Sequence, residues 1–181
     1  LDVGGDKILS IADWEKEMNP ALGLRGIRLS LIRQDIMMNQ LKGILRASLY
    51  GKVKILYPMV SYVDEIIEAN RLLEVAKKEL RERQIPFDEH IETGAMIETP
   101  SSAICADHIL QYVDYVSIGT NDLIQYILAV DRINENIAHL YQPFHPAVIR
   151  ALKGVFTAAN KAGKKVSICG ELGGDPMATL L

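Results

Sequence analysis

The 181-residue sequence lacks a long apolar run and lacks an excess of charge of either sign. A helix that spans a membrane needs about 20 consecutive, mostly apolar residues, and no segment approaches that pattern. The first residues have neither the basic start nor the apolar core of a signal peptide. Lys and Arg number 20 against 23 Asp and Glu, so the net charge is −3 and no basic face for nucleic acid is indicated. We expect a cytoplasmic protein with no membrane insertion and no nucleic-acid partner.

Cysteine is also scarce, and Cys105 and Cys169 are the two in the sequence. Their separation matches neither a metal-binding motif nor a disulfide framework, and it is consistent with a reducing compartment. Internal repeats, low-complexity segments and interdomain linkers are missing too. A hydrophobic content of 49% is that of a folded domain and excludes disorder.

Short β-prone runs alternate with amphipathic segments over most of the chain. Segments rich in Val and Ile predict strands at residues 53–57, 91–97, 113–118 and 165–169. Capping residues and helical periodicity predict helices at residues 33–48, 61–83, 100–109, 120–129, 146–162 and from 176 onward. Strands of this kind joined by helices indicate an α/β fold with a parallel sheet buried on both faces.

The helix that follows the first predicted strand begins with a capping signature, Ser61 followed by Asp64. Its periodicity places Ile67 on the buried face and Lys77 on the solvent face. In the helix after the second predicted strand, Cys105 is interpreted as a packing residue.

Unusual polar residues follow the predicted strands, at the point where each strand ends. Glu98 follows the second strand, Asn121 and Asp122 follow the third, and Cys169 ends the fourth. In parallel α/β folds, ligands bind at the carboxyl edge of the sheet, and barrel active sites are built from these same loops. The pattern predicts one site assembled from at least three strands.

Glu98 and Asp122 are predicted to come from neighbouring strand ends, so that their carboxylates could meet on one cation. Mg²⁺ suits such a pair, because it takes one or two carboxylates and completes its shell with water and substrate oxygens. The alternative is helix capping, for which acidic residues at helix N-termini are common. Glu98 precedes Thr99, which is itself the expected N-cap, and this favours the metal-ligand interpretation.

Cys169 has two interpretations. A lone cysteine at a strand end is often a small buried apolar residue. As a functional group, it has no histidine beside it in the sequence that would activate a thiolate. A neutral thiol that donates a proton is therefore the functional hypothesis.

Arg25 and Arg132 stand in glycine-rich or turn-like settings, where a guanidinium could hold a carboxylate or phosphate through two bonds. From spacing alone, surface charge is the favoured explanation of both. Lys7 follows two glycines and an aspartate as in a phosphate-binding loop, but the helix that should follow such a loop is missing. The four histidines share no metal-binding spacing and are interpreted as structural: His90, His108, His139 and His145.

Six separated motifs together resemble the Enzyme I family, the phosphoenolpyruvate-protein phosphotransferases of bacterial sugar transport. They are DVGGDK at 2–7, NPALGLR at 19–25, MIETP at 96–100, SIGTNDL at 117–123, VDR at 130–132 and CGELGGD at 169–175. Pyruvate phosphate dikinase and phosphoenolpyruvate synthase share the GTND and CGE elements. The run HLYQP at 139–143 and the short spacing favour Enzyme I over both.

This resemblance implies a (β/α)8 TIM barrel of the phosphoenolpyruvate/pyruvate-binding type. It implies that Glu98 and Asp122 hold Mg²⁺, and that Cys169 protonates C3 of the enolpyruvate. It also implies phosphoenolpyruvate contacts by Asp122 and by Asn121, Arg132, Arg25 and Lys7.

The resemblance implies as well that phosphate passes to a histidine and then to a histidine-containing phosphocarrier protein, that pyruvate is released, and that the barrel forms a homodimer. In the family, the acceptor histidine lies in a separate N-terminal domain, and none of the four histidines here matches that motif. A complete barrel has eight strands and about 250 residues. We therefore expect residues 1–181 to be a single partial domain that lacks some strands, with residues 1–3 as the tail of one more, and that is inactive in full transfer by itself.

Three alternatives remain open from the sequence. The chain could belong to a pyruvate phosphate dikinase or phosphoenolpyruvate synthase, or to a metal-dependent aldolase on the same barrel with Glu and Asp as ligands. It could also be a non-catalytic binding or oligomerisation module. Binding of Mg²⁺ and phosphoenolpyruvate separates the last of these from the enzymes.

Overall fold

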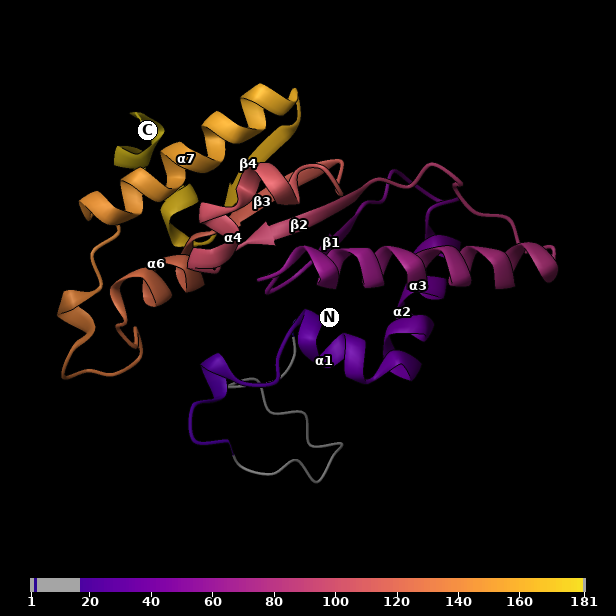
Figure 1. The fold of residues 1–181 in the computed structure, drawn as a ribbon, viewed down its shortest axis with the longest axis horizontal. Coiled ribbons are helices and arrows are strands. Elements are labelled where there is room, and N and C mark those ends of the chain that lie inside the picture. Colours follow the sequence, from indigo (N-terminus) through magenta and orange to yellow (C-terminus); the bar gives the residue numbers. More distant parts are fainter. Residues whose placement is uncertain (1, 3–16, 181) are drawn as a thin grey trace.

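A computed structural model describes residue 2 and residues 17–180, and its centre is a four-stranded parallel sheet (Figure 1). The strands lie side by side in chain order: β1 (Ile55–Tyr57), β2 (Thr93–Ile97), β3 (Tyr115–Gly119) and β4 (Lys165–Cys169). The predicted α/β class, the four strands and their parallel arrangement are confirmed. The bounds of β4 are those predicted, whereas β1, β2 and β3 begin later than predicted.

Helices connect the strands and cover one face of the sheet (Figure 1). The long α3 follows β1, the short pair α4 and α5 follows β2, and α6 and α7 follow β3. The α-helices are α1 (Ile27–Ile32), α2 (Gln34–Ala47), α3 (Val63–Glu82), α4 (Pro100–Ile104), α5 (Ala106–Ile109), α6 (Thr120–Leu128) and α7 (Pro146–Ala162). The 3₁₀ helices are η1 (Pro20–Leu22), η2 (Ala138–Leu140), η3 (Glu171–Gly174) and η4 (Pro176–Leu180).

Local sequence explains the bounds of α7, the helix that packs on α4 and α5. Pro146 occupies its first turn, and the His145 ring accepts a hydrogen bond from the Ala147 amide at 3.2 Å. Gly163, with a φ of +65°, ends it in the left-handed conformation that glycine adopts at low cost. This predicted helix is confirmed at both ends.

The two faces of the sheet differ sharply in polarity. Val116 and Ile118 of β3 and Ile97 of β2 are fully buried under the helices, and each such side chain contributes about 1.5–3 kcal/mol through burial. On the opposite face the register aligns Met96 with Ser117, and Ser117 with Ser167, whose hydroxyls are 3.1 Å apart.

Parallel strands in sequential order, with helices outside and a polar inner face, form a partial (β/α)8 barrel. The described part of the chain supplies four of its strands. None of the helices described is long and apolar enough to cross a membrane.

Several local predictions are wrong. The Glu65 carboxylate, rather than the Ser61 and Asp64 pair, caps α3, because it accepts hydrogen bonds from the amides of residues 61 and 62 at 2.7 and 3.0 Å. Ile67 is 45% exposed, while Lys77 is buried and donates to the Glu89 carbonyl at 3.1 Å. The rest of the predicted apolar face is buried as expected at Ile66, Leu73, Ala76 and Leu80.

The predicted helix at 100–109 is interrupted at Cys105, which ends α4 and begins α5. Cys105 is exposed, so its interpretation as a packing residue is wrong. The Thr99 hydroxyl accepts from the Ser102 amide at 3.2 Å, and the predicted N-cap of α4 is confirmed.

Candidate functional site

The carboxyl ends of β2, β3 and β4 bring two predicted positions, Glu98 and Cys169, into one row with Gly119 between them. Ile97 pairs with Ile118, and Gly119 pairs with Cys169, so that Glu98 lies beside Gly119 at the end of the sheet. Adjacent strands are about 4.8 Å apart. The glycine has no side chain of its own, and the Glu98 carboxylate and Met96 Sδ occupy the space over it, since a Cβ there would lie 2.6 Å from Glu98 Oε2 and 3.1 Å from Met96 Sδ.

Glu98 is held in place by backbone on two sides. Its Oε1 accepts a hydrogen bond from the Met59 amide at 2.6 Å, and the side chain is buried. A Cβ on Gly119 would lie 2.6 Å from Glu98 Oε2, so glycine is required at that position for the carboxylate to fit. Met59 itself adopts a φ of +56°, which an L-residue rarely adopts outside a functional or tightly packed turn.

Burial raises the pKa of Glu98 to about 7. The Met59 hydrogen bond and the charge of Arg25 lower it, while the negative charges of Asp122 and Asp2 raise it further. Glu98 does not cap α4, because Thr99 does so. Its carboxylate is available for another role.

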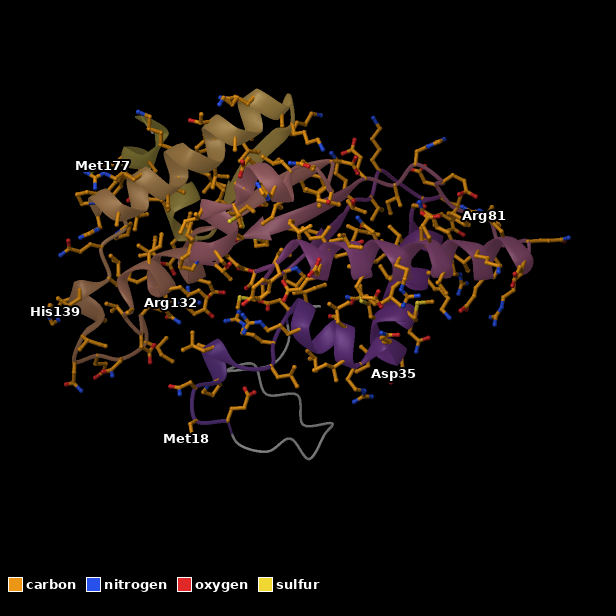
Figure 2. All side chains as sticks on the ribbon, viewed as in Figure 1. Met18, Asp35, Arg81, Arg132, His139 and Met177 are labelled. Carbon is orange, nitrogen blue, oxygen red and sulfur yellow. The ribbon has the colours of Figure 1, made fainter. Side chains whose placement is uncertain are left out.

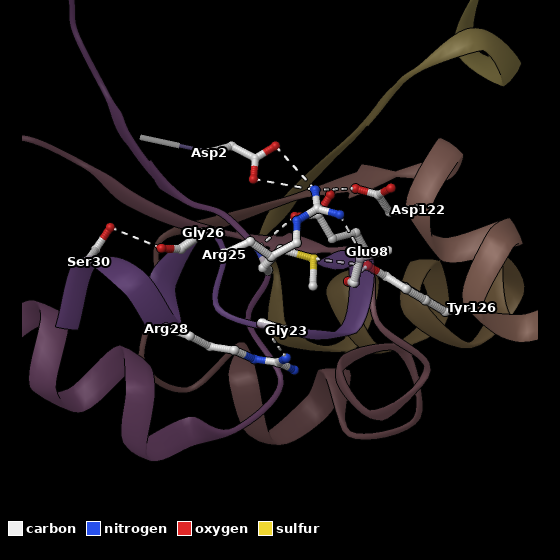
Figure 3. A network of polar contacts seen from close by, with 11 residues as sticks. Asp2, Gly23, Arg25, Gly26, Arg28, Ser30, Glu98, Asp122 and Tyr126 are labelled. Carbon is white, nitrogen blue, oxygen red and sulfur yellow. Dashed lines mark hydrogen bonds and ion pairs between the residues drawn. The ribbon is translucent and has the colours of Figure 1, made fainter. Parts of the chain in front are cut away.

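Arg25 is a buried guanidinium at the centre of a polar network (Figure 3). Its Nη2 donates to Asp122 Oδ2 at 2.9 Å and to the Asp2 carboxylate at 3.4 and 3.5 Å, and its Nη1 donates to the Tyr126 hydroxyl at 3.2 Å. Figure 3 shows Glu98 beside the same guanidinium. Arg25 is therefore no surface charge.

The charge on Arg25 is maintained by its neighbours. Burial lowers the pKa of Arg25, but Asp122, Tyr126 and Asp2 together outweigh it and hold that pKa above its ordinary value. Arg25 Nε is buried and has no hydrogen-bond partner in the part of the chain that the structure describes. A buried donor without an acceptor costs about 1–3 kcal/mol, and an anion beside it would remove that cost.

A cleft of about 820 Å³ opens beside this network. It lies between the loop that precedes α1, the start of α4, and α6 with the residues after it. Arg25, Asp122 and Arg132 all line it, together with Arg28 and Tyr126. Arg132 belongs to the segment that leaves α6 (Figure 2), and its amide donates to Gln125 Oε1 at 3.1 Å. The structure thus brings three predicted binding residues to one cleft, which Met59 and Thr99 also line, and buried Glu98 is bound to the Met59 amide.

Asn121 is placed differently from its neighbour Asp122. Its side-chain oxygen accepts from the Glu171 amide at 3.0 Å, and its carbonyl accepts from the Tyr141 hydroxyl at 3.2 Å. The first bond fastens the start of α6 to η3, which follows β4, and the second fastens it to the segment between η2 and α7. Substrate contact by Asn121 remains a prediction, and in this conformation its amide supports the loop after Cys169.

Cys169 is half-buried at the end of β4. Its Sγ lies 3.3 Å from the Ile118 carbonyl oxygen, 3.5 Å from Ser117 Oγ and 3.5 Å from Met96 Sδ. All three partners are uncharged: the thiol donates to the Ile118 carbonyl and accepts from the Ser117 hydroxyl. Cys169 therefore sits on the inner face of the sheet, on the same face as Glu98.

The donor set at this edge determines which metal ion it could hold. No group of three or more His, Cys, Asp or Glu side chains positioned to hold a metal occurs at residue 2 or residues 17–180. Two carboxylates, Glu98 and Asp122, converge beside Arg25. Two oxygen ligands are too few for a structural zinc site but fit Mg²⁺, which keeps several waters and substrate oxygens.

Tyr126 and the Met59 amide belong to the site, although the motifs did not single them out. Tyr126 follows Asp122 by one helical turn, a spacing that places both on one face of α6. Lys7 lies outside the described residues. Of the histidines, His145 caps α7, whereas His90 and His108 are exposed, and His139 lies at the margin of the molecule (Figure 2).

Comparison with known proteins relates the whole chain to one family. Residues 1–181 match the family model of the phosphoenolpyruvate-binding domain of phosphoenolpyruvate-utilising enzymes. The phosphoenolpyruvate-protein phosphotransferase of Haemophilus influenzae is 51% identical over 181 residues, which are 100% of this chain and 32% of that protein. The protein of the same name from Bacillus subtilis is 49% identical over 178 residues, 98% of this chain and 31% of that protein. The chain spans about a third of the length of these relatives.

Solved structures support the fold. A citrate lyase from Burkholderia xenovorans superposes with a TM-score of 0.56 at 22% identity, over 72% of this chain and 40% of that one. An aldolase/citrate lyase family protein from Burkholderia cenocepacia gives a TM-score of 0.53 at 18% identity, over 77% of this chain and 58% of that one. The predicted partial barrel is confirmed at the level of fold.

Proposed function

Because the chain belongs to the family of phosphoenolpyruvate-binding domains of phosphoenolpyruvate-utilising enzymes, we propose that it forms the phosphoenolpyruvate- and Mg²⁺-binding part of a phosphotransferase. In this proposal the phosphoryl group passes to a histidine and then to a histidine-containing phosphocarrier protein of a sugar phosphotransferase system, and pyruvate is released. The acceptor histidine belongs to another domain, and the barrel pairs as a homodimer.

The observation that carries the proposal is the buried guanidinium of Arg25 next to two carboxylates. Arg25 Nε lacks an acceptor among the described residues, and Arg25 lines the cleft, so its positive charge would attract an anion there. Glu98 and Asp122 lie beside the same guanidinium and would attract a cation (Figure 3). Phosphoenolpyruvate with Mg²⁺ supplies both charges at once.

In this arrangement Glu98 and Asp122 would hold Mg²⁺, which when bound neutralises charge on the phosphoryl and enolate oxygens. Arg25 and Arg132 line the cleft and would donate hydrogen bonds to phosphate and carboxylate oxygens. Preorganised donors of this kind stabilise charge that develops as phosphate leaves. The buried position of Arg25 limits its motion and excludes water from its bonds.

Cys169 would supply the proton that the departing enolpyruvate needs. As the bond between phosphorus and the enol oxygen breaks, the enolate forms pyruvate by taking the thiol proton at C3, and the resulting thiolate regains a proton from water. Cys169 ends β4 on the inner face of the sheet, in the row that contains Gly119 and Glu98. From there its thiol would approach one face of the three-carbon unit.

Calorimetry on the protein expressed from its complete gene tests the proposal. Phosphoenolpyruvate with MgCl₂ is expected to bind the wild type, and Glu98→Gln is expected to weaken that binding by at least about tenfold. Glu135→Gln removes an exposed carboxylate outside the cleft and is expected to bind as the wild type does. Absence of binding to the wild type, or equal binding by Glu98→Gln, would contradict the proposal.

A further inference from the structure

Asp122 and Tyr126 each accept a hydrogen bond from a different terminal nitrogen of the Arg25 guanidinium. Both belong to α6, one turn apart, and helical geometry places them on the same face. Arg25 Nη2 donates to Asp122 Oδ2 at 2.9 Å, while Nη1 donates to the Tyr126 hydroxyl at 3.2 Å (Figure 3). The two terminal nitrogens of Arg25 therefore bind residues one turn apart on α6, and these two acceptors set the plane of the guanidinium.

The Tyr126 hydroxyl also binds the backbone of the turn that precedes Arg25. It donates a hydrogen bond to the carbonyl of Ala21, in the turn that precedes Arg25, and lies 4.0 Å from Met59 Sδ. One hydroxyl thus accepts from the guanidinium and donates to the backbone that leads to it. Burial raises the pKa of Tyr126, so the hydroxyl keeps the proton that this arrangement uses.

We propose that Tyr126 is the positioning residue of the anion site: its hydroxyl, bound to Nη1, fixes the rotation of the Arg25 guanidinium beside the cleft that Arg25 lines. The inference rests on the proposed function and deepens it, because it assigns the orientation of the phosphate-binding arginine to a residue that does not itself contact phosphate. Asp122 and Asp2 cannot supply this orientation, because both accept from Nη2. Acceptors on one nitrogen leave the guanidinium free to pivot about it, whereas a further acceptor on Nη1 prevents the rotation.

Arg28 shows that the turn itself has separate support. Its Nη1 donates to the carbonyls of Leu22 and Gly23 at 2.9 and 3.2 Å, and its Nη2 donates to Ser61 Oγ at 3.2 Å. Loss of the Tyr126 hydroxyl therefore leaves these bonds in place. We expect Tyr126→Phe to change the orientation of Arg25 more than the course of the chain.

The test compares Tyr126→Phe with Tyr57→Phe in the protein expressed from its complete gene. Tyr57 is a buried tyrosine on the helix-facing side of β1, whose hydroxyl donates to Asn70 Oδ1 at 3.0 Å. Both variants lose one tyrosine hydroxyl, but only the first touches Arg25. Because a hydrogen bond to a charged group is among the stronger ones, Tyr126→Phe is expected to weaken phosphoenolpyruvate binding, with MgCl₂ present, by about tenfold or more. Tyr57→Phe is expected to bind as the wild type does.

A double-mutant cycle separates positioning through Arg25 from a general structural effect. Arg25→Lys already removes the guanidinium that Tyr126 holds, so adding Tyr126→Phe to that variant is expected to have little further effect on binding. Additive losses in the cycle, or unchanged binding by Tyr126→Phe alone, would overturn the inference.

A second measurement keeps the inference testable if the proposed function fails. The buried Nε–H of Arg25 should give a resolved signal in ¹⁵N-edited NMR of the unliganded protein, assigned by its loss in Arg25→Lys. Tyr126→Phe is expected to shift or broaden that signal, and Tyr57→Phe to leave it in place. An unchanged Arg25 signal in Tyr126→Phe refutes positioning, whereas failure of the wild type to bind phosphoenolpyruvate refutes the proposed function alone.

Discussion

Gly119 lies directly against the Glu98 carboxylate, and a Cβ at this glycine would stand 2.6 Å from Glu98 Oε2 and 2.9 Å from Glu98 Cβ. Neither atom can move away easily, because Glu98 Oε1 is bound to the Met59 amide at 2.6 Å. Gly119, at the end of β3, therefore limits the positions that the carboxylate of Glu98, which follows β2, can take.

Gly119→Ala is accordingly expected to displace Glu98 and to weaken binding of MgCl₂ with phosphoenolpyruvate by at least about tenfold. The same overpacking should cost about 1–3 kcal/mol of unfolding free energy. Calorimetry and urea denaturation measure the two effects. Gly154→Ala is the control, since a Cβ there, in the middle of α7, meets nothing within 4 Å. It should stabilise the protein by about 0.5–1 kcal/mol and leave binding unchanged.

The raised pKa of Glu98 predicts a specific pH dependence of stability. Its ordinary value is 4.5 and its value in the fold is about 7, so between these values the folded state binds more protons than the unfolded state. The free energy of unfolding should therefore fall as pH rises from about 4.5 through about 7. At 1.36 kcal/mol per pKa unit, this loss is on the order of 3 kcal/mol.

The measurement is urea denaturation of metal-free protein in EDTA across this pH range, for the wild type and for Glu98→Gln. Other titrating groups act on both proteins, so the difference between the two curves isolates Glu98. The variant should gain stability relative to the wild type between pH 4.5 and pH 8. A difference that does not change with pH would contradict the burial of an ionisable Glu98.

Arg25 should be far more important for stability than an exposed arginine with similar bonds. Arg25→Met leaves Asp122 without its 2.9 Å partner in a half-buried site, and breaking a buried ion pair costs about 3–5 kcal/mol. Arg81 forms an ion pair with Glu89 at 2.7 Å at the end of α3 (Figure 2), with both side chains about half exposed. Arg81→Met should cost far less than Arg25→Met, because solvent screens an exposed ion pair. Chemical denaturation of both variants checks the contrast, and similar losses would show that Arg25 is not buried in solution.

The alternation of strands and helices is sufficient to predict the edge of the sheet at which the polar residues meet. Parallel strands present their carboxyl ends together, so the positions of Glu98, Asp122 and Cys169 in the sequence are enough to group them. Helix bounds marked by proline and glycine, as in α7, can also be predicted from the sequence, because those residues fix the local backbone.

The burial of Arg25 could not be predicted in the same way. A guanidinium in a glycine-rich turn has no local signal that separates it from surface charge, and its burial depends on acceptors supplied by α6, far along the chain. Tyr126 gave no signal beyond its spacing from Asp122, and helical spacing shows a shared face but not what that face contacts. The burial of Lys77 likewise depends on the segment after α3, whose Glu89 carbonyl accepts from its amine, and periodicity within α3 does not contain that contact.

The last prediction concerns Cys169 as the donor of the proton that reaches C3 of pyruvate. Its thiol lies on the inner face of the sheet across Gly119 from Glu98, where it can reach only one side of a bound three-carbon unit. In the protein expressed from its complete gene, Cys169→Ala should slow deuterium incorporation at C3 of pyruvate in D₂O by about 10²-fold or more, the usual contribution of a positioned acid. Binding of phosphoenolpyruvate with MgCl₂ should stay within about twofold of the wild type. Cys105→Ala, at the exposed junction of α4 and α5, should alter neither quantity. An unchanged rate of incorporation in Cys169→Ala would assign the proton to another group and leave Cys169 with a packing role beside Ser117 and Met96.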